Sequence, residues 1–182
     1  MVLLNSTTIS SGASSVDFNS SLITSTYKLY QIHCIGVTDS VTSGSNGIAA
    51  RFSADNGSTV VSSGYRFANL RLNEGGSSDT TSQGTTDFLK ICELNGVFHG
   101  MSTGEGINMI VTLYNPLGSG QTMMNYFGTS VADRNTGYGD ESINHWTGSS
   151  IESEPSVVNF VRLLPRSGTF QSGIIKLYGV VA

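Results

Sequence analysis

Short runs of β-branched and aromatic residues make up this chain, and each run is closed by a cluster of Gly, Ser, Asn or Asp. Such runs are typical of β-strands, because branched and aromatic side chains pack well on a pleated, half-buried surface, while the clusters supply turns. The sequence therefore predicts an all-β protein. We expect about ten short strands, at residues 3–9, 16–18, 26–37, 47–53, 65–70, 97–101, 107–113, 122–131, 157–164 and 173–181.

Three of these runs indicate which strand faces are buried. Residues 107–113 alternate between apolar and polar, so one face should meet a single core. Residues 26–37 are apolar on both faces, which predicts a central strand covered from two sides. Residues 173–181 are also apolar on both faces, which predicts an interior strand paired with 26–37. The apolar face of residues 107–113 consists of Ile107, Met109, Val111 and Leu113.

The segments between the runs predict the turns. Asp55-Asn56-Gly57 is a hairpin signal, because Asn and Gly accept a positive φ, and it predicts antiparallel pairing of 47–53 with 59–67. Residues 73–84 contain no apolar side chain, and 133–141 form a second polar segment, so both are expected to be long exposed loops. Many short strands with polar turns favour an antiparallel β-sandwich of jelly-roll type over a barrel.

A single domain accommodates all 182 residues. Within it we expect an N-terminal arm or first strands at 1–20 and the sandwich at 21–182. We find no internal repeat of about 20 to 50 residues and no heptad pattern, which argues against solenoids and coiled-coil fibres.

The small share of charged residues limits the kinds of molecule that the chain is expected to bind. Charged residues are 12% of the chain, about half the usual share, and the net charge is -4 without a basic run. Binding to nucleic acid is therefore not expected. No stretch approaches the roughly 18 apolar residues of a membrane span, and the N-terminus lacks the features of a signal peptide, so synthesis in a cytoplasm is expected.

Residues that could carry chemistry are scattered. His33, His99 and His145 lack metal-ligand spacing, and structural roles are expected, with His33 on a core or sheet face. Cys34 and Cys92 are interpreted as small buried hydrophobes, with a disulfide as the alternative that synthesis in a cytoplasm disfavours. No Gly-x-Ser-x-Gly motif is present. We therefore expect no enzymatic activity, no cofactor and no metal.

Acidic residues cluster at Asp140, Glu141, Glu152 and Glu154. A pair of carboxylates could in principle hydrolyse a glycoside. Adjacent acids in a Gly-rich segment are more typical of exposed loop charges or weak calcium ligands, and the spaced ligands of an EF-hand are absent.

Candidate contact residues for a ligand or partner are Tyr138, His145 and Trp146. Aromatic rings, including those of Tyr126 and Phe127, could stack on a carbohydrate, with His145 beside Trp146 in a sugar pocket. Packing in the core or at an interface is the alternative for the same rings.

Three segments carry a family resemblance. They are Ser25-Thr26-Tyr27-Lys28-Leu29-Tyr30, Arg51-Phe52-Ser53-Ala54-Asp55-Asn56-Gly57-Ser58-Thr59 and Ser172-Gly173-Ile174-Ile175-Lys176-Leu177-Tyr178-Gly179-Val180. Together they resemble small virion proteins of tailed bacteriophages and the terminal modules of phage fibres, and the last is similar to the SGxIKLYG ending of those modules. The resemblance implies a jelly-roll β-sandwich with a place in the virion and no catalytic residues.

The leading hypothesis is a capsid decoration (cement) protein that binds the major capsid protein, because the attachment region and shaft of a tail fibre are not seen. Its N-terminal arm would reach to neighbouring subunits. A homo-oligomer is expected, with a trimer favoured. One alternative is the receptor-binding tip of a tail fibre or spike, contacting host glycan through 73–84 and 133–141. Another is a carbohydrate-active enzyme.

Overall fold

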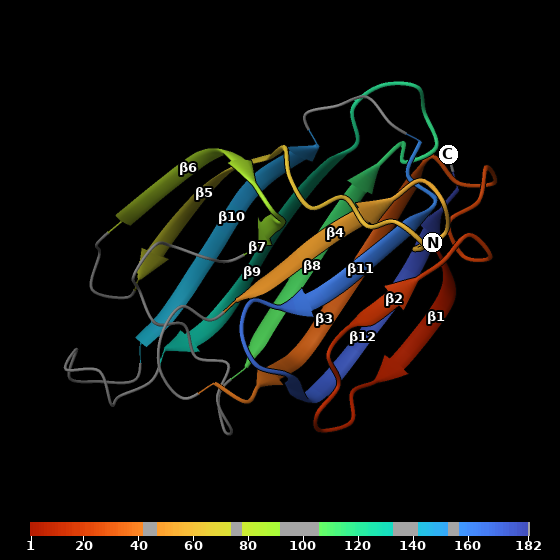
Figure 1. The fold of residues 1–182 in the computed structure, drawn as a ribbon. Helices are drawn as coiled ribbons and strands as arrows, with labels where there is room; N and C mark the ends of the chain where they lie inside the picture. Colours follow the sequence, from red (N-terminus) through yellow and green to blue (C-terminus); the bar gives the residue numbers. More distant parts are fainter. Residues whose placement is uncertain (42–46, 74–77, 92–105, 133–141, 153–156, 182) are drawn as a thin grey trace.

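The computed structural model describes residues 1–41, 47–73, 78–91, 106–132, 142–152 and 157–181 (Figure 1). These residues form twelve strands in two sheets, and every strand pairs antiparallel with its neighbours. Strands make up most of the described residues, and the described part of the chain contains no helix. The all-β prediction is confirmed.

Eight strands form the larger sheet, in the order β1-β12-β3-β8-β9-β10-β5-β6, and four form the smaller, in the order β2-β11-β4-β7. The bounds in the larger sheet are β1 (Val2–Thr8), β12 (Phe170–Val180), β3 (Leu29–Asp39), β8 (Ile107–Tyr114), β9 (Met123–Ala132), β10 (Ser142–Glu152), β5 (Tyr65–Asn73) and β6 (Ser78–Thr86). Those in the smaller sheet are β2 (Val16–Phe18), β11 (Phe160–Pro165), β4 (Ile48–Ser53) and β7 (Leu89–Ile91). The segment 1–20 thus contributes one strand to each sheet.

The smaller sheet lies over one face of the larger, as Figure 1 shows. We call the covered face of the eight-stranded sheet its inner face and the opposite side its outer face. One hydrophobic core fills the space between the sheets. It includes Phe18, Phe52 and Leu163 from the smaller sheet and Tyr30, Ile32, Val111 and Trp146 from the larger. The chain is therefore sandwich-like, with layers of unequal width.

Two strand predictions are confirmed. The four apolar residues of β8 all lie on the inner face and are buried. Strand β12 is an interior strand between β1 and β3, and its register places Ile175 opposite Cys34 and Leu177 opposite Ile32. The C-terminal strand therefore joins two segments of the N-terminal quarter of the chain.

The prediction that residues 26–37 are covered from two sides is wrong. Strand β3 buries Tyr30, Ile32 and Cys34 on its inner face, but its outer face is only half-buried, and Ile35 is 43% exposed. The reason is that the smaller sheet covers one side of the larger sheet only. Among the described residues, apolar side chains on the outer face contact their neighbours in the sheet and no second layer.

The predicted hairpin between 47–53 and 59–67 is also wrong. Asn56 and Gly57 do adopt positive φ, of 60° and 88°, as the turn signal required. However, β4 pairs with β11 and β7, whereas β5 belongs to the other sheet. The segment between them crosses from one layer to the other, and it is anchored where the Phe52 N–H donates to the Tyr65 hydroxyl at 2.9 Å.

The predicted loop at 73–84 is wrong for residues 78–84, and residues 74–77 lie outside the described residues. Residues 78–86 form strand β6, which pairs with β5 at the edge of the sheet. Backbone hydrogen bonds hold an edge strand, so a run of Ser and Thr can occupy it without the apolar alternation that identifies strands in a sequence. The predicted strand at 97–101 and the predicted loop at 133–141 lie outside the described residues.

Two glycines of the C-terminal motif allow close packing. Gly173 has φ +119°, and a Cβ there would lie 2.7 Å from Val37 Cα. At Gly179 a Cβ would lie 2.6 Å from carbons of the Tyr27 ring. Any side chain at Gly173 would collide with backbone, which cannot move aside as a flexible side chain can.

Deletion of residues 173–182 should abolish cooperative folding. It removes most of β12, opens two sheet edges at β1 and β3, and takes Ile175 and Leu177 out of the core. Thermal unfolding followed by circular dichroism would test this, with Val181→Ala, an exposed change beyond the strand, as the control. A cooperative transition near that of the full chain would contradict the expectation.

Gly173→Ala should lower the free energy of unfolding by about 1–3 kcal/mol, because it combines an unfavourable φ with a backbone collision. Gly120→Ala is the matched control, since nothing lies within 4 Å of its Cβ position, and a change within about 0.5 kcal/mol is expected. Urea denaturation measures both. Equal effects of the two substitutions would show that the close approach at Gly173 carries no cost.

Candidate functional site

The outer face of the eight-stranded sheet consists of cross-strand rows of side chains. Residues paired across neighbouring strands project to the same side of a sheet, so the register identifies each row. The central row runs from β12 across the sheet to β6. It consists of Lys176, His33, Ile110, Phe127, Thr147, Leu70 and Thr80.

Large apolar side chains on this face are exposed. Phe127 of β9, at the centre of the sheet, has 60% of its surface exposed. The other exposed large hydrophobic residues on the face are Leu3, Ile35, Leu72, Met123 and Ile143, from β1, β3, β5, β9 and β10. Large apolar side chains that gather on one face of a folded domain indicate a contact surface.

A shallow hollow of about 370 Å³ lies beside Phe127, over β3, β8, β9 and β10. Its lining is mainly apolar, and a histidine stands at each side, His33 from β3 and His145 from β10. A bulge after Cys34 interrupts the pairing of β3 with β8, and there the Gly36 N–H donates to Asn108 Oδ1 at 3.0 Å. We call this the histidine hollow. Its lining side chains on the outer face are His33, Ile35, Asn108, Ile110, Phe127, Thr129 and His145.

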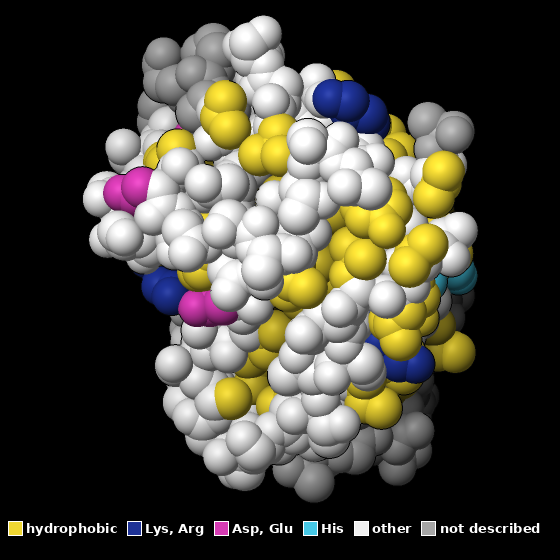
Figure 2. All heavy atoms as spheres, turned by 90° about the vertical axis from the view of Figure 1, so that its right-hand side faces the viewer, with side chains coloured by type: hydrophobic (Ala, Val, Ile, Leu, Met, Phe, Trp, Pro, Cys, Tyr) yellow, Lys and Arg dark blue, Asp and Glu magenta, His cyan; other side chains and the backbone are white. Residues whose placement is uncertain are grey.

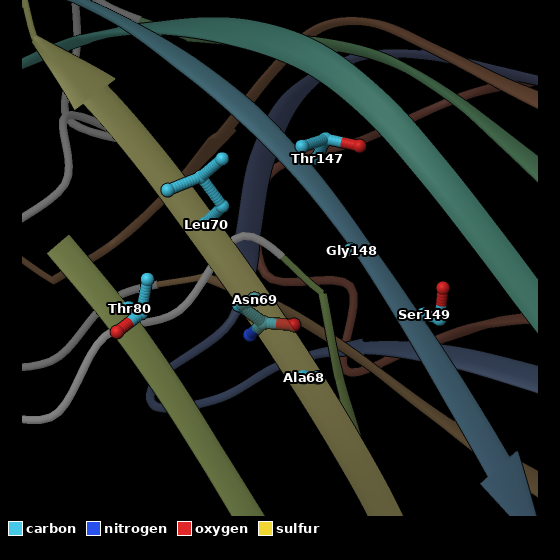
Figure 3. Close-up of a pocket in the computed structure, with 7 residues that line it drawn as sticks. All are labelled: Ala68, Asn69, Leu70, Thr80, Thr147, Gly148 and Ser149. Carbon is cyan, nitrogen blue, oxygen red and sulfur yellow. The ribbon is translucent and has the colours of Figure 1, made fainter. Parts of the chain in front are cut away.

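A second hollow of about 440 Å³ lies on the other side of Phe127. Figure 3 shows its lining, which comes from β5, β6 and β10. Leu70 and Thr147 belong to the central row, and Thr147 is the cross-strand neighbour of Phe127. Phe127 therefore projects between two depressions of the same face.

His33 of the histidine hollow has a polar and an aromatic neighbour on the outer face. Its Nε2 lies 3.3 Å from Gln31 Oε1, and its ring centroid lies 4.7 Å from that of Tyr178. Partial burial and, secondarily, the positive charge of Lys176 on β12 hold the His33 pKa below its ordinary value of 6.5. The prediction of a sheet-face imidazole is confirmed.

The two outer surfaces of the sandwich differ in charge. On the smaller sheet, Arg162 makes a two-pronged ion pair with Asp17, at 2.9 and 2.7 Å, and Arg51 pairs with Asp87 at 3.2 Å. On the outer face of the larger sheet, the charged side chains among those described are Arg66 and Lys176. From the side of β1, most of the hydrophobic side chains gather in one half of the view and the acidic side chains lie in the other (Figure 2).

The structure separates the predicted contact residues. Trp146 lies on the inner face with 2% of its surface exposed, and its indole N–H donates to Ser130 Oγ at 2.8 Å. His145 precedes it in the same strand and therefore lies on the outer face, exposed. The two do not form one pocket, and Tyr138 lies outside the described residues. Phe127, not Trp146, is the aromatic residue that shares a face with His145.

Other candidate residues do not assemble a reactive site in the described ranges. Burial raises the pKa of the Cys34 thiol to about 12, so the thiolate is not accessible near neutral pH. Glu152 is buried in β10 and not exposed in a loop, while Asp140, Glu141, Glu154, Cys92 and His99 lie outside the described residues. The described side chains include no group of three or more His, Cys, Asp or Glu that could hold a metal ion.

His33 and His145 are also too far apart for one metal ion, because they lie three strand spacings apart, about 14 Å. Within the described ranges, no helix has the length and apolar character needed to cross a membrane.

Comparisons with known proteins identify no relative. No protein-family model, no curated protein and no solved structure matches the chain.

The outer face was only partly predictable from the sequence: Phe127 was among the candidate stacking residues, but Ile35, Leu72 and Ile143 were not. The signal for Ile35 is that residues 26–37 carry apolar side chains on both faces, a pattern that predicted two-sided burial, whereas Leu72 and Ile143 lie outside the strands expected from the sequence.

The free energy of unfolding should decrease as the pH falls from about 7.5 to 5.5, in part because of His33. The folded-state pKa of His33 is lowered, so below about 6.5 the unfolded chain binds a proton that the folded chain does not. Urea denaturation at both pH values should show a smaller decrease for His33→Gln than for the wild type.

Lys176→Gln provides a second measurement, since removing the nearby cation should raise the His33 pKa in an NMR titration. The expectation fails if His33→Gln and the wild type have the same pH dependence.

Proposed function

We propose that this chain is a non-enzymatic structural protein of a tailed-bacteriophage particle, of the capsid decoration type, and that it acts by binding protein surfaces. The observation that carries the assembly role is the broad outer face of the larger sheet, with exposed Phe127 and few charges. The virion setting comes from the resemblance of residues 25–30, 51–59 and 172–180. The jelly-roll type of sandwich is part of the same proposal, and two antiparallel layers are compatible with it.

The contrast between the two outer surfaces supports an assembly role. Arg162–Asp17 and Arg51–Asp87 give the smaller sheet an ordinary solvated surface of paired charges. A comparable set of ion pairs is missing from the described outer face of the larger sheet, which instead exposes large apolar side chains. Interface cores are depleted in charged residues and enriched in aromatic ones, as this face is.

Non-enzymatic action is supported by the composition of the hollows. The second hollow is lined by Thr80, Thr147 and Ser149 without a described His, Asp or Glu that could activate their hydroxyls. In the histidine hollow, the described side chains include no carboxylate beside His33 or His145. The interactions available there are packing and hydrogen bonding.

A second candidate function is a receptor-binding module of a tail fibre or spike. It is favoured by the exposed Phe127 ring beside Asn108, Thr129 and His145. Aromatic rings with neighbouring amide and hydroxyl groups can bind a sugar, the ring against its apolar face and the polar groups at its hydroxyls. The ligand would then be a glycan of the host surface.

Copy number per particle distinguishes these functions. A decoration protein should be present in hundreds of copies of each purified particle, whereas a tail module should be present in a handful. Quantitative mass spectrometry of particles, with the major capsid protein as internal standard, measures this ratio. Absence of the chain from washed particles would contradict both virion assignments, and reproducible turnover of a polysaccharide would instead favour an enzyme.

A further inference from the structure

The outer face carries a projection and a receiving surface side by side. Phe127 stands 60% exposed between two depressions, and the histidine hollow directly beside it is lined mainly by apolar groups. A surface that contains both a knob and a matching hole can bind a copy of itself related by a twofold axis, because each knob then fills the hole of the other copy.

The size of the face suits a contact between proteins. Eight strands at a spacing of about 4.8 Å span about 34 Å, and strands of about eight residues at about 3.4 Å per residue are about 27 Å long. The resulting area, about 900 Å², is comparable to the roughly 800 Å² that each partner contributes to a standard interface. A single sugar or a short peptide would cover only part of it.

The charges on the face permit contact with a second copy. Arg66 lies on β5 and Lys176 on β12, two and three strands from Phe127 on opposite sides of β9. The two cations therefore flank the central contact, and Phe127 and the histidine hollow lie between them. Between them the described side chains are apolar, hydroxyl, amide or imidazole groups, which can be buried against their own kind without like-charge repulsion.

We propose that the outer face binds the outer face of a second copy of this chain, and that Phe127 of each copy occupies the histidine hollow of the other. The inference rests on the proposed function and names the partner of its assembly surface. Phe127 is then the central contact residue, while Ile110 and Ile35 supply apolar walls and His33 and His145 bound the contact. Buried aromatic residues at the centre of an interface carry much of the binding energy.

The test is sedimentation equilibrium of the full chain over about 1–100 μM. The wild type should reach a species of twice the chain mass of 19.2 kDa, which is a dimer and not the trimer favoured from the sequence. Phe127→Ser should raise the dissociation constant at least about 30-fold, as expected for a central contact residue. Val157→Ser is the matched control, because Val157 is also an exposed apolar residue but lies outside the strands of this face, and it should leave the dissociation constant unchanged.

Circular dichroism must show that all three proteins have the same folded-state spectrum and a cooperative thermal transition, so that loss of association is not loss of folding; a lower Tm for the dissociated variant is expected, because association stabilises the folded state. A wild-type chain that stays monomeric over this range would overturn the inference. An oligomer that Phe127→Ser leaves intact would overturn it as well, because association would then use another surface.

Binding of the same proteins to particles lacking the chain separates this inference from the proposed function. A monomeric wild type that binds particles, and loses that binding on Phe127→Ser, would assign the face to the particle surface: the inference fails and the proposed function stands. A dimer abolished by Phe127→Ser in a chain that never binds particles would support the inference and contradict the proposed function.

Discussion

Packing of the smaller sheet against the inner face of the larger is the interaction on which the rest of the structure depends. Phe18, Phe52 and Phe170 are completely buried in the layer between the sheets. Strands from both ends of the chain meet there, since β12 lies between β1 and β3 and β2 pairs with β11. In this arrangement a layer of four strands covers part of a layer of eight. The backbone of β12 at Gly173 packs closely against Val37 of β3, and the chain crosses from the smaller to the larger sheet after β4.

The unequal width of the two sheets explains why their outer surfaces differ in charge and in exposed apolar side chains. An eight-stranded sheet has two faces, and the described part of the chain supplies a second layer for only one of them. The smaller sheet turns a ladder containing Asp17, Arg162 and Arg51 outward, whereas the larger turns Phe127, Met123 and Ile143 outward. Exposing apolar groups is costly unless something covers them. The proposed assembly role assigns a cover to that face.

The features that could be predicted from the sequence are those that depend on local interactions, and the features that were missed depend on contacts between distant segments. Strict alternation was sufficient to place Met109 and Val111 inside, because facing is a local property of a strand. Strand β6 was missed because its Ser- and Thr-rich sequence has no apolar face, although its backbone pairs with β5. The proposed sugar pocket of His145 and Trp146 could not form, because consecutive strand residues project to opposite faces, and a sequence does not reveal which face is covered.

By itself, the sequence determined the all-β class, most strand positions, the positive φ at Asn56-Gly57 and the pairing of the C-terminal strand with residues 26–37. These follow from local side-chain preferences and from apolar runs that must be interior. Only the tertiary structure decided that β4 and β5 belong to different sheets, and that Phe127 and the two histidines share an open face. Strand partners and covered faces depend on which distant segments bury one another, and the same apolar residue fits equally well in a core or at an interface.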